Sequence, residues 1–583
     1  MRCSTFLIFA TALAGSLTNA LAVPAAPQGT DELHRRGVST VIVKTANRGS
    51  FRGLSLGSLG QDQFNGIRYV QPITSANRFQ RATALSDLSS SVIHDATQTG
   101  PLCIQSTTSN LLANEMSEDC LTMQIIRPQG IPANSPVPVL VFFHGGGWAH
   151  GGSTFPIYNG TELVAASVLQ NQPVIYVNLN YRLGIFGFLG GKQMQQADAQ
   201  GTAALNAGYW DQHDALQFVQ ENIGAFGGDP TKVTIWGQSA GAASVAAHLL
   251  ANGGKSGASL FSRAVLESGS AQLYPRYDPT ASRPQQQFNT LLKATSCSSL
   301  DCLRGQSTDA LAQANIDVVR NGSSTFSPTL DSYFHTIAPS KAVQNGAFAD
   351  VPILMGTNLD DGTFVQACTV QETDADLLQL FQSQYGSTSV VKNLLATYPD
   401  QAPQGCPFRP VLYGVQPTDR FYGFSSQYKR CAAIETDLLF TAGKRAMLSA
   451  AARFNKHKAF GYLWAQRTAV NGDPAKGVTH SCELGMIFAR PTLNGQSDAA
   501  ARQYASSADI ESTTSHIVTS LLTFAYKGDP NARGFPSWPA YDDASGSAML
   551  MQFEGTYNTT LVPDTFRGPQ VAYLQSQAAA FGV

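Results

Sequence analysis

The chain has few charges, no long apolar run beyond its N-terminus, and no internal repeat or low-complexity linker. Charged residues make up 13% of its 583 residues, and 38 Lys and Arg nearly balance 40 Asp and Glu. Because there is no basic stripe, nucleic acid is not an expected partner. Because no later segment is apolar over a sufficient length, no transmembrane segment is expected. The apolar content of 43% instead predicts a large folded core.

The N-terminus has the layout of a secretory signal peptide. One arginine precedes a short apolar run, and small residues stand where cleavage would occur. We predict a signal peptide over residues 1–22 and a secreted, extracellular mature chain. Arg35 and Arg36 predict a processing site that removes a pro-segment at 23–36, with a solvated basic turn as the alternative. Glycosylation sequons, as in secreted proteins, occur at Asn159, Asn321 and Asn558.

The cysteine count fits an oxidising compartment. Nine are present, and eight remain once Cys3 leaves with the signal peptide. The local pairs expected to bond are Cys103 with Cys120 and Cys297 with Cys302. The other four allow three connectivities, among which we favour Cys406 with Cys431 because they bracket one local segment. These four are Cys368, Cys406, Cys431 and Cys482.

Short apolar runs alternate with longer helical patterns along the chain. Runs such as "VPVLVFFHGGG" and "DVPILMGTN" predict buried strands, whereas "DQHDALQFVQENIGAF" and "AGAASVAAHLLANGG" predict helices. This alternation predicts an α/β fold in which helices flank a mostly parallel central sheet. Ligands of such sheets bind at the carboxyl ends of the strands, where the polar residues of this chain fall.

The region at about 368–454 has a different pattern. It is helical but interrupted by a segment rich in proline and glycine. We interpret it as a helical, cap-like insertion that packs over one end of the sheet. The whole of 37–583 is then expected to form a single domain.

The pattern G-x-S-x-G occurs twice, at residues 53–57 and 237–241. A nucleophilic serine in this pattern needs a strand directly before it and a helix directly after it. Ser239 has both, because "VTIW" precedes its motif and "AGAASVAAHLL" follows. Ser55 has neither, and a glycine-rich turn is predicted there. Taken alone, the Ser239 motif is also compatible with a close-packed turn that carries no chemistry.

A catalytic serine needs oxyanion donors, a base and an orienting acid. The strand before "HGGGW" breaks into glycines whose N–H groups are accessible, which makes Gly146, Gly147 and Ala240 the expected donors. In this arrangement the acid and then the base follow the serine along the chain. Asp360 and Asp361 stand at a strand end. The histidines beyond them are His457, His480 and His516.

His480 is favoured as the base because it lies in a glycine-bearing loop. His457 stands between two lysines, which is typical of a solvated surface. His516 lies within an amphipathic helical pattern.

In this order the motifs resemble the type B carboxylesterase/lipase family, the cholinesterase-like branch of the α/β-hydrolases, in its secreted fungal lipase/esterase form. The segments "SEDCLTMQI", "NYRLGIFGFL", "IWGQSAGA" and "ESGS" follow in family order, and the similarity covers nearly all of the mature chain. The resemblance implies an α/β-hydrolase fold with helical insertions over the active site. It implies Ser239 as nucleophile, Asp361 as acid, His480 as base, Gly146, Gly147 and Ala240 as oxyanion donors, and the disulfides Cys103–Cys120 and Cys297–Cys302.

The chain departs from the family pattern at three positions near the site. The acid is usually Glu, so the shorter Asp361 must lie closer to His480, or Asp360 substitutes for it. The residue before the nucleophile is commonly Glu, and Gln238 removes that negative charge. A disulfide at Cys482 would pin the loop that carries His480.

The sequence therefore predicts a secreted serine hydrolase that cleaves carboxylic esters through an acyl-enzyme, either a carboxylesterase or a lipase. The expected partners are a small-molecule or lipid ester substrate and, transiently, a lipid interface; no metal or cofactor is expected. Only 16 residues separate Cys103 from Cys120, which favours a general esterase over a strict triglyceride lipase. The alternative is a catalytically silent, cholinesterase-like binding or adhesion module. Nothing favours a peptidase with the same triad.

Overall fold

The computed structural model describes most of the chain beyond its N-terminal segment. The predicted signal peptide and pro-segment, and the sequons at Asn321 and Asn558, lie outside the described residues. Of the helices within the described ranges, none combines the length and the apolarity that a bilayer crossing requires. The described ranges are 38–105, 116–273, 277–320, 326–401, 404–408, 423–466, 475–490, 507–542, 548–555 and 559–582.

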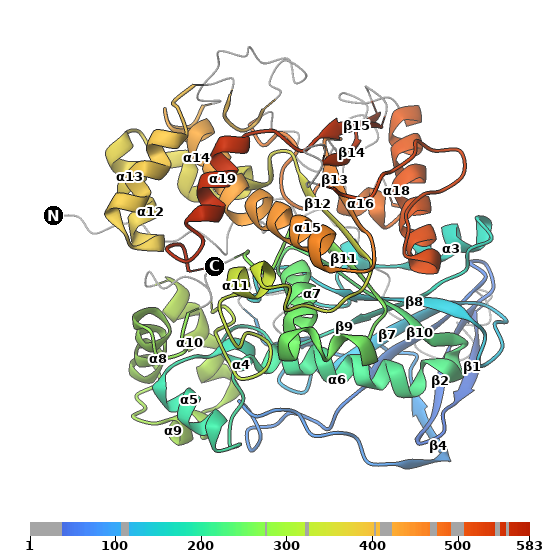
Figure 1. Ribbon diagram of the computed structural model, residues 1–583. Coiled ribbons are helices and arrows are strands. Elements are labelled where there is room, and N and C mark those ends of the chain that lie inside the picture. The colour runs from blue at the N-terminus through green and yellow to red at the C-terminus, as the bar shows by residue number, and fades with distance from the viewer. Residues whose placement is uncertain are drawn as a thin grey trace.

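Within these ranges, a sheet of 13 strands runs through the molecule (Figure 1). Neighbouring strands are parallel from β9 to β14, and antiparallel pairs extend the sheet at both ends. The mostly parallel α/β sheet is confirmed. In spatial order the strands are β1 (Val38–Lys44), β2 (Arg48–Leu56), β3 (Gln61–Arg68), β7 (Thr122–Pro128), β9 (Ile175–Leu179), β8 (Val137–Phe143), β10 (Gly228–Gln238), β11 (Arg263–Glu267), β12 (Ile353–Asn358), β13 (Ala459–Trp464), β14 (Met549–Phe553) and β15 (Thr560–Pro563), with β4 (Leu88–Asp95) beside β2.

Helices cover both faces of the sheet, which is why its central strands are apolar throughout (Figure 1). Every residue of β8 is buried, and its side chains alternate between two cores. Val141 and Phe143 belong to the core on the face that α7 covers, whereas Leu140 and Phe142 belong to the core on the face that α18 covers. The described helices are α3 (Thr161–Leu169), α4 (Gly184–Phe188), α5 (Lys192–Ala199), α6 (Ala207–Asn222), α7 (Ala240–Leu250), α8 (Ser282–Ala294), α9 (Leu300–Arg304), α10 (Thr308–Arg320), α11 (Pro339–Gln344), α12 (Asp374–Tyr385), α13 (Thr388–Thr397), α14 (Tyr428–Thr436), α15 (Ala442–Phe454), α16 (Leu484–Ile487), α18 (Ser507–Lys527) and α19 (Gly568–Ser576).

The region interpreted as an insertion contains α12 to α15. Helix α14 packs on two short 3₁₀ helices, η5 (Asp361–Phe364) and η6 (Gln366–Val370), that follow strand β12. A π-helical turn, η9 (Asp437–Thr441), joins α14 to α15. Such turns are frequent at functional sites, and this one brings Phe440 against the ring of His480.

The prediction of a glycine-rich turn at Ser55 is wrong. Ser55 lies in β2 and pairs with Asp62 of β3 across a hairpin. Its hydroxyl donates to the Asp62 carboxylate at 2.8 Å and accepts from Gln129. Gly53 belongs to the same strand, and a Cβ there would lie 2.5 Å from the Phe64 ring, so the position has no room for a side chain. Close strand packing, and not a turn, explains these glycine and serine residues.

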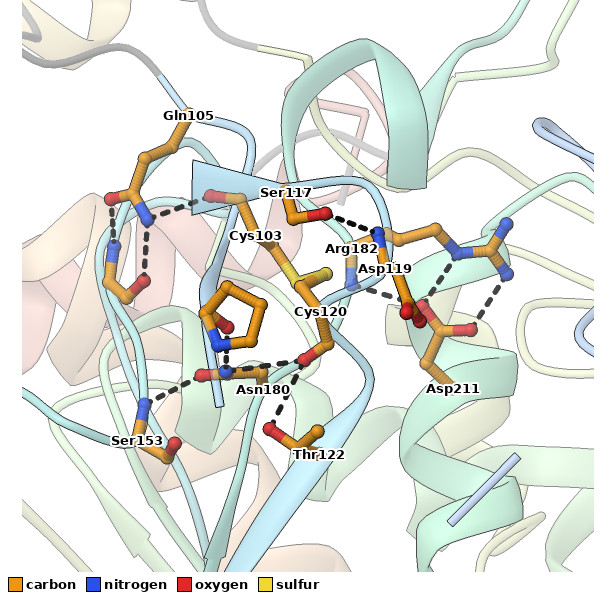
Figure 2. The surroundings of a disulfide bond; sticks show 12 residues. Cys103, Gln105, Ser117, Asp119, Cys120, Thr122, Ser153, Asn180, Arg182 and Asp211 are labelled. Carbon is orange, nitrogen blue, oxygen red and sulfur yellow. Dashed lines mark hydrogen bonds and ion pairs between the residues drawn. A yellow bond between two sulfur atoms is a disulfide. The ribbon is translucent and has the colours of Figure 1, made fainter. Parts of the chain in front are cut away.

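The disulfides Cys103–Cys120 and Cys297–Cys302 are present as expected. The first one lies beside Asn180, the residue that follows β9 (Figure 2). Asn180 fixes this position, because its side-chain amide donates to the carbonyls of Pro101 and Cys120 while its oxygen accepts from Ser153 N–H.

The favoured pairing of Cys406 with Cys431 is wrong. Cys431, on α14, bonds to Cys368 on η6, and their Cα atoms are 5.4 Å apart. Cys406 keeps a buried thiol, which lies 3.5 Å from the Thr436 hydroxyl. The partner of Cys431 is set by the packing of α14 on η6, which the sequence spacing does not reveal. Cys482 is also a buried thiol, so within the described part of the chain no disulfide pins the His480 loop.

Candidate active site

Ser239 stands at the turn between β10 and α7, as its motif predicts. Its backbone has φ 58° and ψ −125°, a left-handed conformation that side-chain-bearing residues rarely adopt. The two motif glycines are required by close contacts. A Cβ at Gly241 would lie 1.9 Å from the carbonyl oxygen of Phe143, and one at Gly237 would lie 2.4 Å from the Gly241 carbonyl carbon.

Three side chains meet in one hydrogen-bonded row at this turn. His480 Nε2 lies 2.8 Å from Ser239 Oγ, and His480 Nδ1 lies 2.8 Å from Asp361 Oδ1. The Nδ1–H therefore donates to Asp361, and Nε2 is left to accept from the serine hydroxyl. The ring centroids of Phe364 and Phe440 each lie 4.8 Å from the imidazole centroid and 6.2 Å from each other, so the imidazole packs against a corner formed by two apolar rings.

Asp361, and not Asp360, contacts the imidazole. Because Asp361 starts η5 directly after β12, its backbone lies close enough for the shorter side chain to reach His480. Its second carboxylate oxygen accepts from Asn358 N–H at 2.7 Å and from the Ser268 hydroxyl at 3.0 Å. Sequence reasoning missed both of these residues, although Asn358 ends the buried strand β12 and Ser268 follows the buried strand β11, where polar residues signal a site.

Asp360 holds the loop that carries His480. Its carboxylate accepts from Val478 N–H at 3.0 Å and from Phe408 N–H at 2.8 Å. A Cβ at Gly477 would lie 2.5 Å from this carboxylate, so the loop passes directly over it. The two neighbouring aspartates thus have different tasks. Asp361 orients the ring and Asp360 anchors its backbone.

The other two candidate histidines lie elsewhere. His457 is exposed, as predicted from its lysine neighbours. His516 lies within α18 and stacks on Phe535 with ring centroids 4.3 Å apart. Burial lowers the pKa of His516 to about 4, so this histidine is a neutral core residue.

Gln238 touches the histidine loop. Its buried side-chain amide donates to Ser481 Oγ at 2.9 Å, and the same nitrogen lies 3.4 Å from His480 Nε2. Ser481 has φ 67°, so the residue directly after the imidazole is itself held in a left-handed conformation. Gln238 therefore places a neutral hydrogen-bond donor where the family pattern has an acid.

The glycine loop passes beside the serine. A Cβ at Gly145 would lie 3.1 Å from Ser239 Cβ, and Gly146 and Gly147 have φ values of 102° and 63°. None of the loop hydrogen bonds between described backbone groups uses the N–H of Gly146 or Gly147. Ala240 is the first residue of α7, where N–H groups have no acceptor within the helix.

Two buried acids lie behind the row of side chains. Glu483 accepts from the Asn358 side chain at 2.5 Å, and Glu267 accepts from Trp236 Nε1 at 2.8 Å. Burial raises the pKa of Glu483 to about 7, and the charge of Asp361 contributes to this shift. Burial also raises the pKa of Glu267 well above its usual value. The protein interior therefore disfavours further negative charge next to Asp361.

A third buried acid, on α14, tests how burial alone shifts a carboxyl pKa in this protein. Glu435 lies on α14, is 2% exposed, and has its pKa raised by burial from 4.5 to about 8. Because the folded chain holds this proton more tightly than the unfolded chain, stability should fall as pH rises from about 4.5 to about 8, by about 1.4 kcal/mol per pH unit. Glu435→Gln should remove that loss, so its melting temperature should increasingly exceed that of the wild type across this window. Glu511→Gln, at an exposed position on α18, is the control. A melting-temperature difference that does not vary with pH would contradict the expectation.

Comparisons with known proteins agree with this architecture. A model of the carboxylesterase family matches residues 39–568. Secreted lipase 1 of Botryotinia fuckeliana is 32% identical over 548 residues, which cover 88% of this chain and 87% of that protein. Lipase 2 of Diutina rugosa is 31% identical over 575 residues, which cover 92% and 96%. The crystal structure of Aspergillus niger EstA has a TM-score of 0.78 and 26% identity, and the match covers 94% of this chain and 99% of that one. The chain therefore belongs to the carboxylesterase family and has its α/β-hydrolase fold.

Proposed function

We propose that this carboxylic-ester hydrolase works through an acyl-enzyme formed on Ser239. The observation that carries the proposal is the continuous row of hydrogen bonds from Asp361 through His480 to the serine hydroxyl. Serine is a weak nucleophile until a base accepts its proton, and the base needs a partner that fixes its tautomer. The row supplies both requirements at hydrogen-bonding distance.

In the first half of the reaction, His480 Nε2 accepts the Ser239 proton as Oγ attacks the ester carbonyl. The carbonyl oxygen becomes negatively charged, and the N–H groups of Gly146, Gly147 and Ala240 are the proposed donors to it. Losing one such donor typically costs about 10²–10³ in rate. His480 then gives its proton to the departing alkoxide, so an alcohol leaves and the acyl group stays on Oγ.

In the second half, water replaces the alcohol. His480 Nε2 accepts a proton from water as its oxygen attacks the acyl carbonyl, and it returns the proton to Ser239 Oγ when the carboxylic acid leaves. Asp361 keeps Nδ1 protonated and supports the positive ring that forms in each half. The Phe364 and Phe440 rings packed against the imidazole restrict the water around this charge, which strengthens its attraction to Asp361.

A covalent probe tests this assignment. We expect a fluorophosphonate to label the wild type on Ser239, and Ser239→Ala to lose both the label and at least about 10³-fold of its ester hydrolysis. Ser55→Ala is a matched control, because it removes the serine of the other G-x-S-x-G pattern and should still be labelled. An unlabelled wild type would favour a silent binding module, and a labelled Ser239→Ala would place the nucleophile elsewhere.

The neutral residue before the nucleophile, Gln238, offers a second test. In Gln238→Glu a carboxylate would replace the amide nitrogen 3.4 Å from His480 Nε2 and would stabilise the protonated ring. The other ionisable groups facing this imidazole are Asp361 and Glu483, with Lys444 beyond Asp361. We expect the acid limb of the kcat/KM profile to move up by about one pH unit. Gln220→Glu, on α6, adds the same charge at a distance, and an equal shift there would contradict a local effect.

We propose a general esterase preference within this family of esterases and lipases. The segment between Cys103 and Cys120 is short for a lid at a lipid interface, and its apolar residues are few. Leu111, Leu112 and Ala113 lie outside the described residues, whereas Ile104 is buried and Met116 half-buried. The similar fungal proteins are named lipases, and the similar A. niger structure is named an esterase.

Substrate preference can be measured with esters of increasing acyl chain length. We expect the hydrolysis rate to follow the dissolved ester concentration and to level off above the solubility limit, because a short segment cannot cover and uncover a large apolar surface. The control is a soluble short-chain ester over the same concentrations. A steep rise in rate at the solubility limit would identify an interfacial lipase instead.

We also propose that the mature chain is secreted as one hydrolase unit over 37–583, with 368–454 as its insertion. Two similar fungal proteins carry secretion in their names, and the described chain has three disulfides. Of the three sequons, Asn159 is the one that lies within the described residues. It is half-buried, and its side-chain oxygen accepts from Thr161 N–H at 2.9 Å.

A further inference from the structure

The side chain of Gln105 pairs with a backbone segment far along the chain. Its oxygen accepts from Gly151 N–H at 2.9 Å, and its amide nitrogen donates to Gly151 O at 2.9 Å (Figure 2). The same nitrogen donates to Cys103 O at 3.1 Å. Gln105 is only 4% exposed, so these bonds form away from bulk water. The amide thus clamps Gly151 in the way that a neighbouring strand would.

Gly151 closes the loop that carries Gly146 and Gly147. It has φ 121°, and a Cβ there would lie 2.3 Å from the His144 ring and 2.8 Å from Gly145 O. Within the loop, Gly146 O accepts from Ala149 N–H at 3.0 Å and from His150 N–H at 3.2 Å. Fixing Gly151 therefore fixes the far end of a compact turn whose near end is the tip of β8.

We propose that Gln105 is a positioning residue that holds the glycine loop in the orientation that receives the oxyanion. The proposal rests on the proposed function of Gly146 and Gly147 as donors. Through Cys103 O, the clamp also connects this loop to the Cys103–Cys120 disulfide. The disulfide is thereby connected to the glycine loop through the Gln105 side-chain amide, in addition to closing its own segment.

The need for a clamp follows from the loop sequence. Three consecutive glycines have no side chains to anchor them and lose the most conformational freedom when they are ordered. Oxyanion donors must point at the position that the charged oxygen reaches in the transition state, and small misorientations weaken that contact. The loop's own bonds close the turn, while the Gln105 amide ties it to another part of the molecule. Loss of the clamp should therefore weaken transition-state binding more than substrate binding.

Gln105→Met tests the clamp, because it preserves side-chain length and removes all three hydrogen bonds. With a soluble short-chain p-nitrophenyl ester, we expect kcat to fall by roughly tenfold to a hundredfold and KM to stay within about twofold. The affinity of a trifluoromethyl ketone, which forms an oxyanion on the serine, should fall by the same factor as kcat. Gln105→Glu keeps the acceptor for Gly151 N–H but places a carboxylate oxygen against the carbonyls of Gly151 and Cys103, so we expect a loss of kcat at least as large as in Gln105→Met.

Gln220→Met is the matched control. Gln220 also donates to two backbone carbonyls, Pro230 O at 2.9 Å and Leu260 O at 2.8 Å, but on a helix outside the site. It should keep the wild-type kcat and ketone affinity. Rates are expressed per fluorophosphonate-reactive site, so that a misfolded fraction does not count as slow catalysis.

The outcomes separate the clamp from the proposed function. A wild type without fluorophosphonate labelling would overturn the proposed function itself. Normal labelling with an unchanged kcat per site and ketone affinity in Gln105→Met would overturn only the clamp. A fall in labelled sites with an unchanged kcat per site, in Gln105→Met or Gln105→Glu, would show a purely structural role and would overturn it too.

Discussion

The close approach of α7 to the end of β8 is the constraint on which the rest of the site depends. The Cα of Gly241 packs so tightly that any Cβ would meet Phe143 O at 1.9 Å. This contact brings the start of the helix beside the glycine loop that follows β8. It also forces the sharp left-handed turn at Ser239, so the hydroxyl projects from the strand end. One packing contact therefore determines the serine turn and its distance from Gly145.

Parallel neighbouring strands bring the remaining groups to the same edge. Strand β10 leads to Ser239, β11 leads to Ser268, and β12 leads to Asn358 and Asp361. Because parallel strands end on one side of the sheet, residues far apart in sequence meet there. His480 joins them from a loop that Asp360 anchors. The short acid is sufficient because η5 begins at the strand end.

The surroundings of the imidazole limit charge. Two aromatic rings pack against it, Gln238 is neutral, and burial disfavours the ionised forms of Glu267 and Glu483. Asp361 is thus the acid in direct hydrogen-bonding contact with the ring. The Gln238 amide donates a hydrogen bond to Ser481 Oγ, which stabilises the left-handed residue next to His480. The neutral Gln238 before the catalytic-motif serine therefore helps to hold the loop that carries His480.

Much of this protein is determined by its sequence alone. Apolar runs that end in glycine or polar residues predicted the parallel sheet, and the strand and helix around Ser239 distinguished it from Ser55. Local spacing was sufficient for the disulfides Cys103–Cys120 and Cys297–Cys302. These features depend on contacts within short stretches of chain, or on one residue's effect on its own backbone.

Tertiary structure alone decided the rest. The choice of Asp361 over Asp360, the bond of Cys431 to Cys368, the strand at Ser55, and the contacts of Gln238 and Gln105 join segments separated by tens to hundreds of residues. A side chain's sequence position does not say which distant backbone group it will meet. The partner of each side chain is set by how α14, the glycine loop and the histidine loop pack against the ends of the sheet. A shift of one residue in that packing would give the side chain a different partner.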